Sequence, residues 1–378
     1  MIRIVADDKI PFLRGALEPF AGVAYLPGKK ISKEILKDTD ALLIRTRTKC
    51  TGSLLDGTNV SFIGTATIGY DHIDTVYCDK HKIRWTNAPG CNSSSVQQYI
   101  TAALLKLALD HHYDLEDKTI GIVGVGNVGS KVEKIARILG MNVLLNDPPR
   151  ARKEGAGNFV SFDKILNESD IVTVHVPLCF MDEDNTFHLF NNKSIKKMKN
   201  GAWLFNTSRG EVTDTPALLK ALASGKLGGA VIDVWENEPD IALELIARAF
   251  IATPHIAGYS TDGKANGTAM VVNSLCKYFN FPPENWYPAD VPFPSKAAIN
   301  IDGKGKSDND IIREAVFHTY NIEDDDRKLR CNPADFEILR GDYPLRREFP
   351  SYTINLKGGN RNVLKTLDEM GFKTNVFD

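Results

Sequence analysis

Arg209, His255 and a carboxylate at Glu236 or Glu238 each follow closely on a short apolar run that has the composition of a strand. If these runs are parallel strands of one sheet, their carboxyl ends meet at one edge and the three groups lie close together. An imidazole can accept a hydroxyl proton, a carboxylate can orient that imidazole, and a guanidinium can bind a substrate carboxylate through two hydrogen bonds. Each residue alone has an ordinary structural explanation, but the three together favour the oxidation of a hydroxy acid.

The strands that would position these groups fall into three series. The first series covers residues 2–6, 41–45, 62–65 and 84–86, and the second covers 120–123, 143–146, 170–176, 202–206, 229–234 and 251–253. A third, shorter series covers 297–301, 352–356 and 374–377. Helical patterns at 93–108, 131–139, 266–279 and 308–320 alternate with them. Because the second series is almost continuously apolar, we expect a parallel sheet that is covered on both faces.

A glycine loop lies between the first two strands of the second series. It has the spacing Gly124-x-Gly126-x-x-Gly129, and Asp147 stands at the end of the following strand. In such a loop the first glycine permits a tight turn, the second lets a pyrophosphate approach the backbone, and the third lets the helix pack closely on the strand. The pyrophosphate then lies at the helix N-terminus. Since Asp147 can accept hydrogen bonds from ribose hydroxyls and would repel a 2′-phosphate, the pattern predicts NAD rather than NADP as the cofactor.

The composition is that of an ordinary globular protein. The chain has 378 residues, 43% hydrophobic and 25% charged, with a formal net charge of −2, so we expect no nucleic acid and no membrane as a partner. No apolar run approaches the roughly 20 residues of a membrane span, and the first residues form a strand rather than a signal peptide. The six cysteines have no metal-ligand spacing, which indicates small buried side chains in a reducing cytoplasm and no bound metal.

The length and the strand series predict three domains. Residues 1–92 and 259–286 are expected to form a substrate-binding domain, residues 93–258 an NAD-binding Rossmann domain, and residues 287–378 a small C-terminal α/β domain. A proline-rich boundary, with prolines at 282, 283, 288, 292 and 294, precedes or opens the last domain. The predicted fold class is therefore α/β, with two Rossmann-like, doubly wound parallel sheets and a smaller third unit.

Four blocks of the sequence resemble the signatures of D-isomer-specific 2-hydroxyacid dehydrogenases. They are the glycine block at 121–129, Asn-Thr-Ser-Arg-Gly at 206–210, Asp-Val-Trp-Glu-Asn-Glu-Pro at 233–239 and Thr-Pro-His-Ile-Ala-Gly at 253–258. The resemblance implies the same fold and an NAD-dependent dehydrogenase. It also implies that Arg209, Glu238 and His255 are the catalytic residues, with His255 as the proton donor to the keto acid. The position of the carboxylate in the third block selects Glu238 over Glu236.

The resemblance further implies positions for the cofactor and the substrate. The residues implied for the cofactor are Gly124, Gly126, Asn127, Val128, Gly129, Asp147, Val176, Thr207, Ser208, Asp233 and Gly258. Among them, Asp233 is the natural partner of the nicotinamide carboxamide, and Val176 offers only its main chain. The residues implied for the substrate are Arg45, Thr46, Thr67 and Tyr259. Thr46 stands where a serine is expected, which keeps the hydroxyl.

Further features resemble a branch of the family whose substrate is a small phosphorylated hydroxy acid. They are the segments 42–45, 64–67, 88–92, 147–150 and 255–259, together with the extra C-terminal domain. This branch implies a homodimer formed through that domain. The phosphate needs cationic partners, for which the candidates are Arg45, Arg47, Lys49, Arg346 and Arg347, and we favour Arg45. The alternatives are a dehydrogenase for a different phosphorylated 2-hydroxy acid, such as 3-phosphoglycerate, and a non-catalytic NAD-sensing corepressor.

Overall fold

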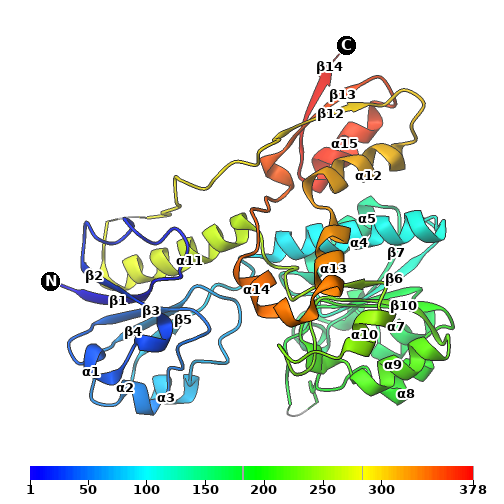
Figure 1. The fold of residues 1–378 in the computed structure, drawn as a ribbon. Helices are drawn as coiled ribbons and strands as arrows, with labels where there is room; N and C mark the ends of the chain where they lie inside the picture. Colours follow the sequence, from blue (N-terminus) through cyan, green and yellow to red (C-terminus); the bar gives the residue numbers. More distant parts are fainter. Residues whose placement is uncertain (181–182, 283, 378) are drawn as a thin grey trace. The chain divides into compact units, whose positions relative to one another are not determined.

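The chain forms two compact units in the computed structural model, which describes residues 1–180, 183–282 and 284–377. The first unit comprises residues 1–92 and 260–292, and the second comprises residues 93–259 and 293–378. Figure 1 labels most of their helices and strands. Among the linker prolines, Pro283 lies outside the described residues. The division into three domains stays a prediction.

The first unit is built on a five-stranded parallel sheet with the order β2-β1-β3-β4-β5. Its strands are β1 (Arg3–Asp7), β2 (Gly22–Leu26), β3 (Ala41–Ile44), β4 (Phe62–Thr65) and β5 (Arg84–Thr86). Its helices are η1 (Gly28–Lys30), α1 (Lys33–Leu36), α2 (Gly52–Leu55), α3 (Thr75–Lys80) and α11 (Thr261–Phe279). Ile4 and Phe62 share a buried cluster with Val272 of α11, whereas Val5 and Ile63 belong to a different cluster. Helix α11 therefore covers one face of this sheet.

The second unit contains a six-stranded parallel sheet with the order β11-β10-β9-β8-β6-β7. Its strands are β6 (Thr119–Val123), β7 (Asn142–Asn146), β8 (Ile171–Val174), β9 (Ala202–Asn206), β10 (Leu227–Ile232) and β11 (Ile251–Ala252). The order reverses at β6, which pairs with β7 on one side and with β8 on the other. In parallel α/β sheets, ligands bind beyond the carboxyl ends of the strands at such a reversal.

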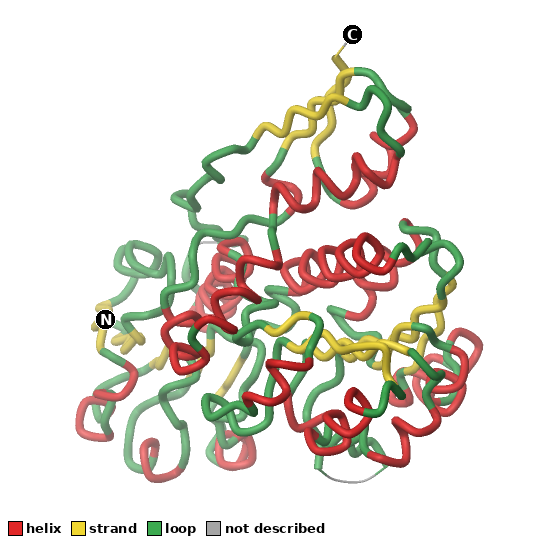
Figure 2. The backbone as a smooth tube through the Cα atoms, turned by 45° about the vertical axis from the view of Figure 1, so that its right-hand side comes forward, coloured by secondary structure: helices red, strands yellow, loops and turns green. Residues whose placement is uncertain are grey.

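Helices lie on both faces of this sheet, which Figure 2 shows nearly edge-on. They are α4 (Ser93–His111), α5 (Gly129–Ile138), α6 (Pro148–Glu154), η2 (Ala156–Asn158), α7 (Phe162–Glu168), α8 (Asn192–Lys197), η3 (Gly210–Val212), α9 (Thr215–Ala223) and α10 (Leu243–Arg248). Residues of α4 and α5 share a buried cluster with Ile120 and Phe205, and residues of α7 to α10 share another with Val172 and Leu204. Burial on both faces explains the nearly continuous apolar strands.

The C-terminal segment, residues 293–377, carries a small parallel sheet with the order β12-β13-β14. Its elements are β12 (Ala298–Asp302), α12 (Asp308–Thr319), α13 (Ile322–Cys331), η4 (Pro333–Asp335), α14 (Phe336–Gly341), η5 (Phe349–Ser351), β13 (Thr353–Lys357), α15 (Asn362–Met370) and β14 (Lys373–Phe377). Helix α12 packs on α4, and Ile311 and Ile354 belong to the same buried cluster as Leu104 of α4. The C-terminal segment therefore shares one core with residues 93–259.

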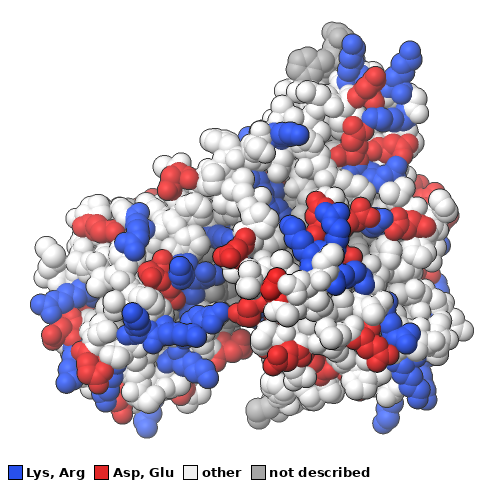
Figure 3. Space-filling view, in the orientation of Figure 1, with Lys and Arg blue, Asp and Glu red and all other residues white. Residues whose placement is uncertain are grey.

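Charged side chains of both signs are mixed over the face drawn in Figure 3, in line with the net charge of −2. None of the helices in the described part of the chain is long and apolar enough to cross a membrane.

The predicted α/β fold class is confirmed, with two larger parallel sheets and a small C-terminal parallel sheet. The differences are local. The apolar pattern does not predict β2, an edge strand without a fully buried residue. Helix α11 begins at Thr261, capped by the Ser260 hydroxyl, rather than at residue 266. Its first turns contain Gly263, which weakens the helical pattern but is required because a Cβ there would lie 2.8 Å from the Cβ of Asn92.

Candidate active site

The carboxyl ends of the six strands in the second unit lie level with one another. Strand pairing aligns their last residues in one row, which consists of Asn146, Val123, Val174, Asn206, Ile232 and Ala252. The next residues along the chain are Asp147, Gly124, His175, Thr207, Asp233 and Thr253. The segments that carry the predicted catalytic and cofactor residues of this unit therefore all start at one edge of the sheet.

The glycine loop turns sharply after β6. Gly124 has a φ of +86°, and a Cβ on Gly129 would lie 2.0 Å from the Gly124 carbonyl oxygen, so α5 starts in contact with the loop. By contrast, a Cβ on Gly126 would meet no atom within 4 Å, and both Gly126 and Asn127 are exposed. The loop therefore has open space beside its backbone, where a pyrophosphate is expected to lie.

Asp147 connects this loop to the end of β7. Its Oδ2 accepts a hydrogen bond from the Val125 N–H at 2.8 Å, and its Oδ1 accepts one from the Arg150 N–H at 3.0 Å and so caps α6. The Arg150 guanidinium also donates to the Val125 carbonyl and pairs with Glu154. A carboxylate has about four lone-pair sites, so Asp147 keeps acceptor capacity for the two hydroxyls of a ribose.

The other residues predicted for the cofactor are more enclosed. Val128, Val176 and Gly258 are half-buried. Ser208 is buried, and its hydroxyl donates to the Asn206 side chain at 2.9 Å. Ser208 can therefore offer a cofactor little beyond its main chain.

Arg209 follows β9 in a turn that Asn206 holds. The amide of Asn206 donates to the Arg209 carbonyl at 2.9 Å and accepts from the Ser208 N–H at 3.1 Å. Gly210 packs against the chain that follows β10, since a Cβ on it would lie 1.9 Å from the Trp235 carbonyl carbon. The turn that carries Arg209 therefore lies directly against the turn that leads to the predicted carboxylates.

His255 and Glu238 form a hydrogen-bonded pair. Nδ1 of His255 lies 2.7 Å from Oε2 of Glu238 and 3.0 Å from its Oε1. The Trp235 N–H donates to Oε1 of Glu238 at 3.0 Å, which fixes the carboxylate. Because Nδ1 faces the carboxylate, Nε2 is the ring atom that can exchange a proton with a substrate.

Glu236 serves a different purpose. Its carboxylate accepts from the Thr215 N–H at 2.8 Å and lies 2.7 Å from Nε2 of His188. Burial opposes its ionisation, but these partners hold the pKa of Glu236 below its usual value. The structure thus pairs Glu238, and not Glu236, with His255.

Asp233 braces the loop that carries His255. Its side chain accepts from the Thr253 hydroxyl at 2.6 Å, the Ile256 N–H at 2.8 Å and the Ala257 N–H at 3.0 Å. It is only 1% exposed, and burial raises its pKa despite these hydrogen bonds. A contact between Asp233 and the nicotinamide carboxamide stays a prediction.

Two residues near the site carry no signal in the sequence. His175 follows β8, where its ring lies 3.3 Å from the Thr207 hydroxyl, and burial lowers its pKa to about 3. Arg340 belongs to α14, and its Nη1 lies 3.6 Å from Oε2 of Glu238. A lone histidine after a strand, or an arginine in a short helix about a hundred residues further on, matches no motif.

The predicted substrate residues Arg45, Thr46 and Thr67 belong to the first unit. The Arg45 guanidinium donates to the Lys9 carbonyl at 3.1 Å, and Thr46 is exposed. The Thr67 hydroxyl donates to the Gly69 carbonyl at 2.9 Å. These residues follow β3 and β4, whose last residues pair directly, so they start at the carboxyl edge of that sheet. Tyr259, by contrast, belongs to the second unit.

Arg346, one of the predicted phosphate candidates, is not placed to hold a phosphate. It is 4% exposed, donates to the Ala257 carbonyl at 2.6 Å and lies over the Tyr320 ring at 4.5 Å. Arg347 is also buried. The guanidinium of Arg346 therefore joins the C-terminal segment to the loop after β11 and is not available to a ligand.

Two regions of the chain match known families. Residues 92–257 match the family described as D-isomer specific 2-hydroxyacid dehydrogenase, NAD binding domain. Residues 293–371 match a domain of unknown function.

Curated relatives match nearly the whole chain. The protein named erythronate-4-phosphate dehydrogenase from Bacteroides fragilis is 50% identical over 93% of this chain and 99% of its own length. The protein of the same name from Proteus mirabilis is 40% identical over 98% of this chain and 99% of its own length. Among solved structures, D-lactate dehydrogenase from Aquifex aeolicus, complexed with NAD and lactic acid, is 28% identical with a TM-score of 0.61, covering 74% of this chain and 95% of that one.

Proposed function

We propose that this chain, which belongs to the D-isomer-specific 2-hydroxyacid dehydrogenase family, oxidises 4-phospho-D-erythronate to 2-oxo-3-hydroxy-4-phosphobutanoate with NAD, in the biosynthesis of pyridoxal phosphate. The observation that carries the reaction type is the His255–Glu238 pair at the sheet edge that also carries the glycine loop. The choice of substrate is supported by the relatives, which are named for erythronate 4-phosphate.

In this proposal His255 exchanges the proton. During oxidation its Nε2 accepts the proton of the substrate's 2-hydroxyl, and in the reverse direction the imidazolium returns it to the keto acid. Glu238, at 2.7 Å from Nδ1, keeps the ring oriented and stabilises the imidazolium. Arg209 binds the carboxylate of the substrate through two hydrogen bonds and polarises the bond between C2 and its oxygen.

The residues of the glycine loop fit a dinucleotide. Gly126 offers open backbone and Asp147 offers carboxylate oxygens beside it, so these residues would hold the pyrophosphate and the adenosine ribose. Val176, Thr207, Asp233 and Gly258 are proposed for the nicotinamide half. When bound, NAD supplies the hydride acceptor.

The substrate's other contacts are also proposals. Thr46, Thr67 and Tyr259 would bind the hydroxy acid, and Arg45 would bind its phosphate because an arginine can hold phosphate oxygens with two parallel hydrogen bonds. We further propose that the chain acts in the cytoplasm as a homodimer formed through the C-terminal segment.

To test this function, three acids are compared at equal concentration with NAD, and each reaction is monitored by the absorbance of NADH. We expect rapid oxidation of 4-phospho-D-erythronate and much slower turnover of 3-phosphoglycerate and of unphosphorylated D-erythronate. A preference for 3-phosphoglycerate would replace the proposed substrate. NAD binding without turnover of any acid would instead support a sensor.

A further inference from the structure

The C-terminal segment contacts the loop that carries His255 on both sides of that residue. Before it, the Ala252 N–H donates to Asp326 of α13 at 2.7 Å. After it, Arg346 donates to the Ala257 carbonyl at 2.6 Å, and the Tyr259 ring meets the Tyr343 ring edge-on at 5.9 Å. The position of His255 therefore depends on a segment that lies beyond the dehydrogenase match at 92–257.

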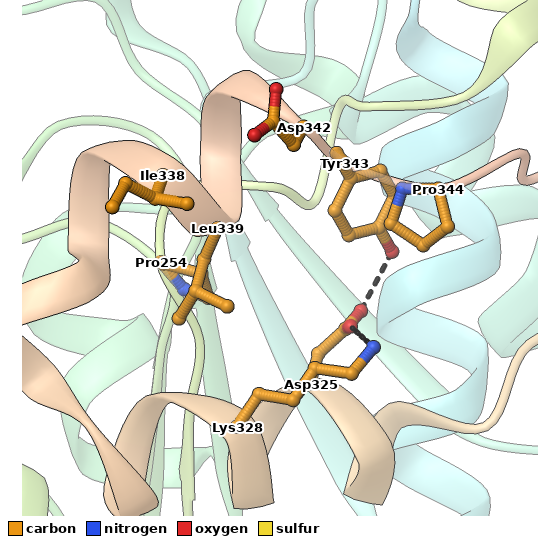
Figure 4. Close-up of a pocket in the computed structure, with 8 residues that line it drawn as sticks. All are labelled: Pro254, Asp325, Lys328, Ile338, Leu339, Asp342, Tyr343 and Pro344. Atoms are coloured by element: carbon orange, nitrogen blue, oxygen red, sulfur yellow. Dashed lines mark hydrogen bonds and ion pairs between the residues drawn. The ribbon is translucent and has the colours of Figure 1, made fainter.

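The residue next to His255 also faces this segment. Pro254 lines a cavity of about 280 Å³ together with Leu339 of α14 and Tyr343. Figure 4 shows these side chains around the cavity, with the Tyr343 hydroxyl directed at Asp325 of α13, to which it donates at 2.6 Å. The C-terminal segment thus forms a wall behind the catalytic loop.

Arg340 extends from this wall to the catalytic carboxylate. Its Nη1 lies 3.6 Å from Oε2 of Glu238 and 3.4 Å from Glu337 on its own helix. Its guanidinium carbon lies within 6 Å of the Phe336 and Tyr259 rings. The side chain is 23% exposed, and its Nε is buried without a hydrogen-bond partner. These neighbours confine the guanidinium beside the His255–Glu238 pair.

Arg340 provides Glu238 with a permanent positive charge, which His255 cannot provide. Burial alone would raise the pKa of Glu238, while His255, the Trp235 N–H and Arg340 hold it below its usual value. The charge of His255 appears and disappears as the proton moves. Arg340 is always charged, so it balances the carboxylate in the half of the cycle in which the imidazole is neutral.

We propose that Arg340 is a positioning residue of the active site, which keeps the Glu238 carboxylate ionised and oriented against His255 throughout the reaction. This assigns a task to the region that matches a domain of unknown function, and it rests on the proposed function of His255 and Glu238. A purely structural Arg340 would anchor α14 and affect stability alone.

The first test uses Arg340→Gln, Arg340→Lys and the control Arg327→Gln, which removes an exposed arginine of the same segment that pairs with Asp324 at 2.6 Å. Removing the cation raises the pKa of Glu238, so this carboxylate is protonated at higher pH and then no longer supports His255. We expect kcat of Arg340→Gln to fall about five- to ten-fold and the acid limb of the oxidation to move to higher pH. Arg340→Lys should restore most of both, and Arg327→Gln should change neither. An unchanged pH profile in Arg340→Gln would overturn the proposal.

The second test asks whether Arg340 acts through Glu238. In a Glu238→Gln background, adding Arg340→Gln should cost no further kcat, because the carboxylate that it serves is gone. An equal loss in both backgrounds, or a raised KM specific to phosphorylated acids, would make Arg340 a substrate ligand and refute the positioning role. If wild type instead prefers a different 2-hydroxy acid, only the proposed substrate fails, and the same measurements are made with that acid.

Discussion

His255 is held in a conformation that few residues adopt. Its φ is +56°, in the left-handed region that is uncommon for a residue with a Cβ and costs of order 1 kcal/mol. The strain is offset by hydrogen bonds on each side: the His255 N–H donates to the Asp233 carbonyl at 2.7 Å, and the next two N–H groups donate to the Asp233 carboxylate. The imidazole is therefore aimed by the backbone before any substrate arrives.

Replacement of His255 by Gln or Ala should reduce turnover by roughly 10²–10⁴-fold while NAD affinity changes little, since only proton transfer is lost. Steady-state kinetics together with NAD titration of the variants measures both quantities. Near-normal turnover of His255→Gln would show that another group exchanges the proton.

Replacement of Glu238 by Gln should also slow turnover and alter the pH profile of the oxidation. The imidazolium that forms in the oxidation loses its counter-charge, so the acid limb of the profile should move. The pH dependence of kcat/KM measures the shift. An acid limb that stays in place would contradict the role of the carboxylate.

His175 gives a stability prediction with a defined sign. Its pKa falls from 6.5 to about 3 in the folded chain because of burial, so between these values the unfolded chain binds a proton that the folded chain does not. Stability should therefore fall as pH drops through this window, by up to about 1.4 kcal/mol per pH unit. His175→Gln should flatten the dependence, which urea unfolding at a series of pH values would measure. Equal slopes in both proteins would refute the assignment.

The sequence predicts the pair but not the residues around it. Arg209, Glu238 and His255 follow apolar strands, and a position after an apolar strand can be predicted from the sequence. Arg340 reaches Glu238 only through the packing of α14, about a hundred residues later, and His175 is a single residue without a repeat or a motif. Contacts that depend on tertiary packing cannot be predicted from a local sequence pattern.

At the scale of elements, the glycine loop and α6 are joined by one side chain. Asp147 accepts from the loop at Val125 and caps α6 at Arg150. Asp147→Asn removes the charge that would repel a 2′-phosphate but keeps an acceptor, so discrimination against NADP should relax with a modest loss of NAD affinity. Asp147→Ala should also lose the cap, at about 1 kcal/mol of stability. Binding titrations with both cofactors measure the preference.

A matched control separates the cap from the ribose contact. Asp214 caps α9 by accepting from the Ala217 N–H at 3.2 Å. Asp214→Ala should cost similar stability and leave the preference between NAD and NADP unchanged. If Asp147→Asn still rejects NADP, a different residue must discriminate between NAD and NADP at the ribose.

Apolar runs alone are enough to place most strands of the six-stranded sheet. Strands β8 and β9 are buried along their whole length, and β6 and β10 along most of theirs. Apolar runs do not reveal β2, a half-exposed edge strand that pairs with β1. Its existence depends on a parallel partner that lies about twenty residues away, which its own composition does not reveal.

At the scale of the whole molecule, helix α4 lies within the second unit rather than on its surface. Its buried residues include Tyr99, Ile100, Leu104 and Leu107, and it contacts both α5 and α12. The buried Gln98 amide donates to Thr319 and to the Arg347 carbonyl. A helix that is apolar on all sides needs cover on all sides, and here the C-terminal segment provides part of it.

The C-terminal segment is also the part of the chain through which we predict a homodimer. Helices α12 and α15 bury one face of the small C-terminal sheet, while the other face carries a ladder of hydrogen-bonded Asn side chains at 300, 355 and 375. Because most soluble oligomers are symmetric homodimers, we expect the full chain to be a homodimer in light scattering. Hydrogen exchange should show amides of residues 293–377 that lose protection on dilution, as expected for an interface in that segment.

A chain that ends near Pro288 should not form this dimer. It loses the proposed interface and at the same time uncovers the side of α4 that α12 buries, so it should elute as a monomer or aggregate. Aggregation alone would be ambiguous, which is why the dilution experiment on the full chain accompanies it. A truncated protein that remains a well-behaved dimer, with no concentration-dependent protection in residues 293–377 of the full chain, would place the interface within residues 1–287.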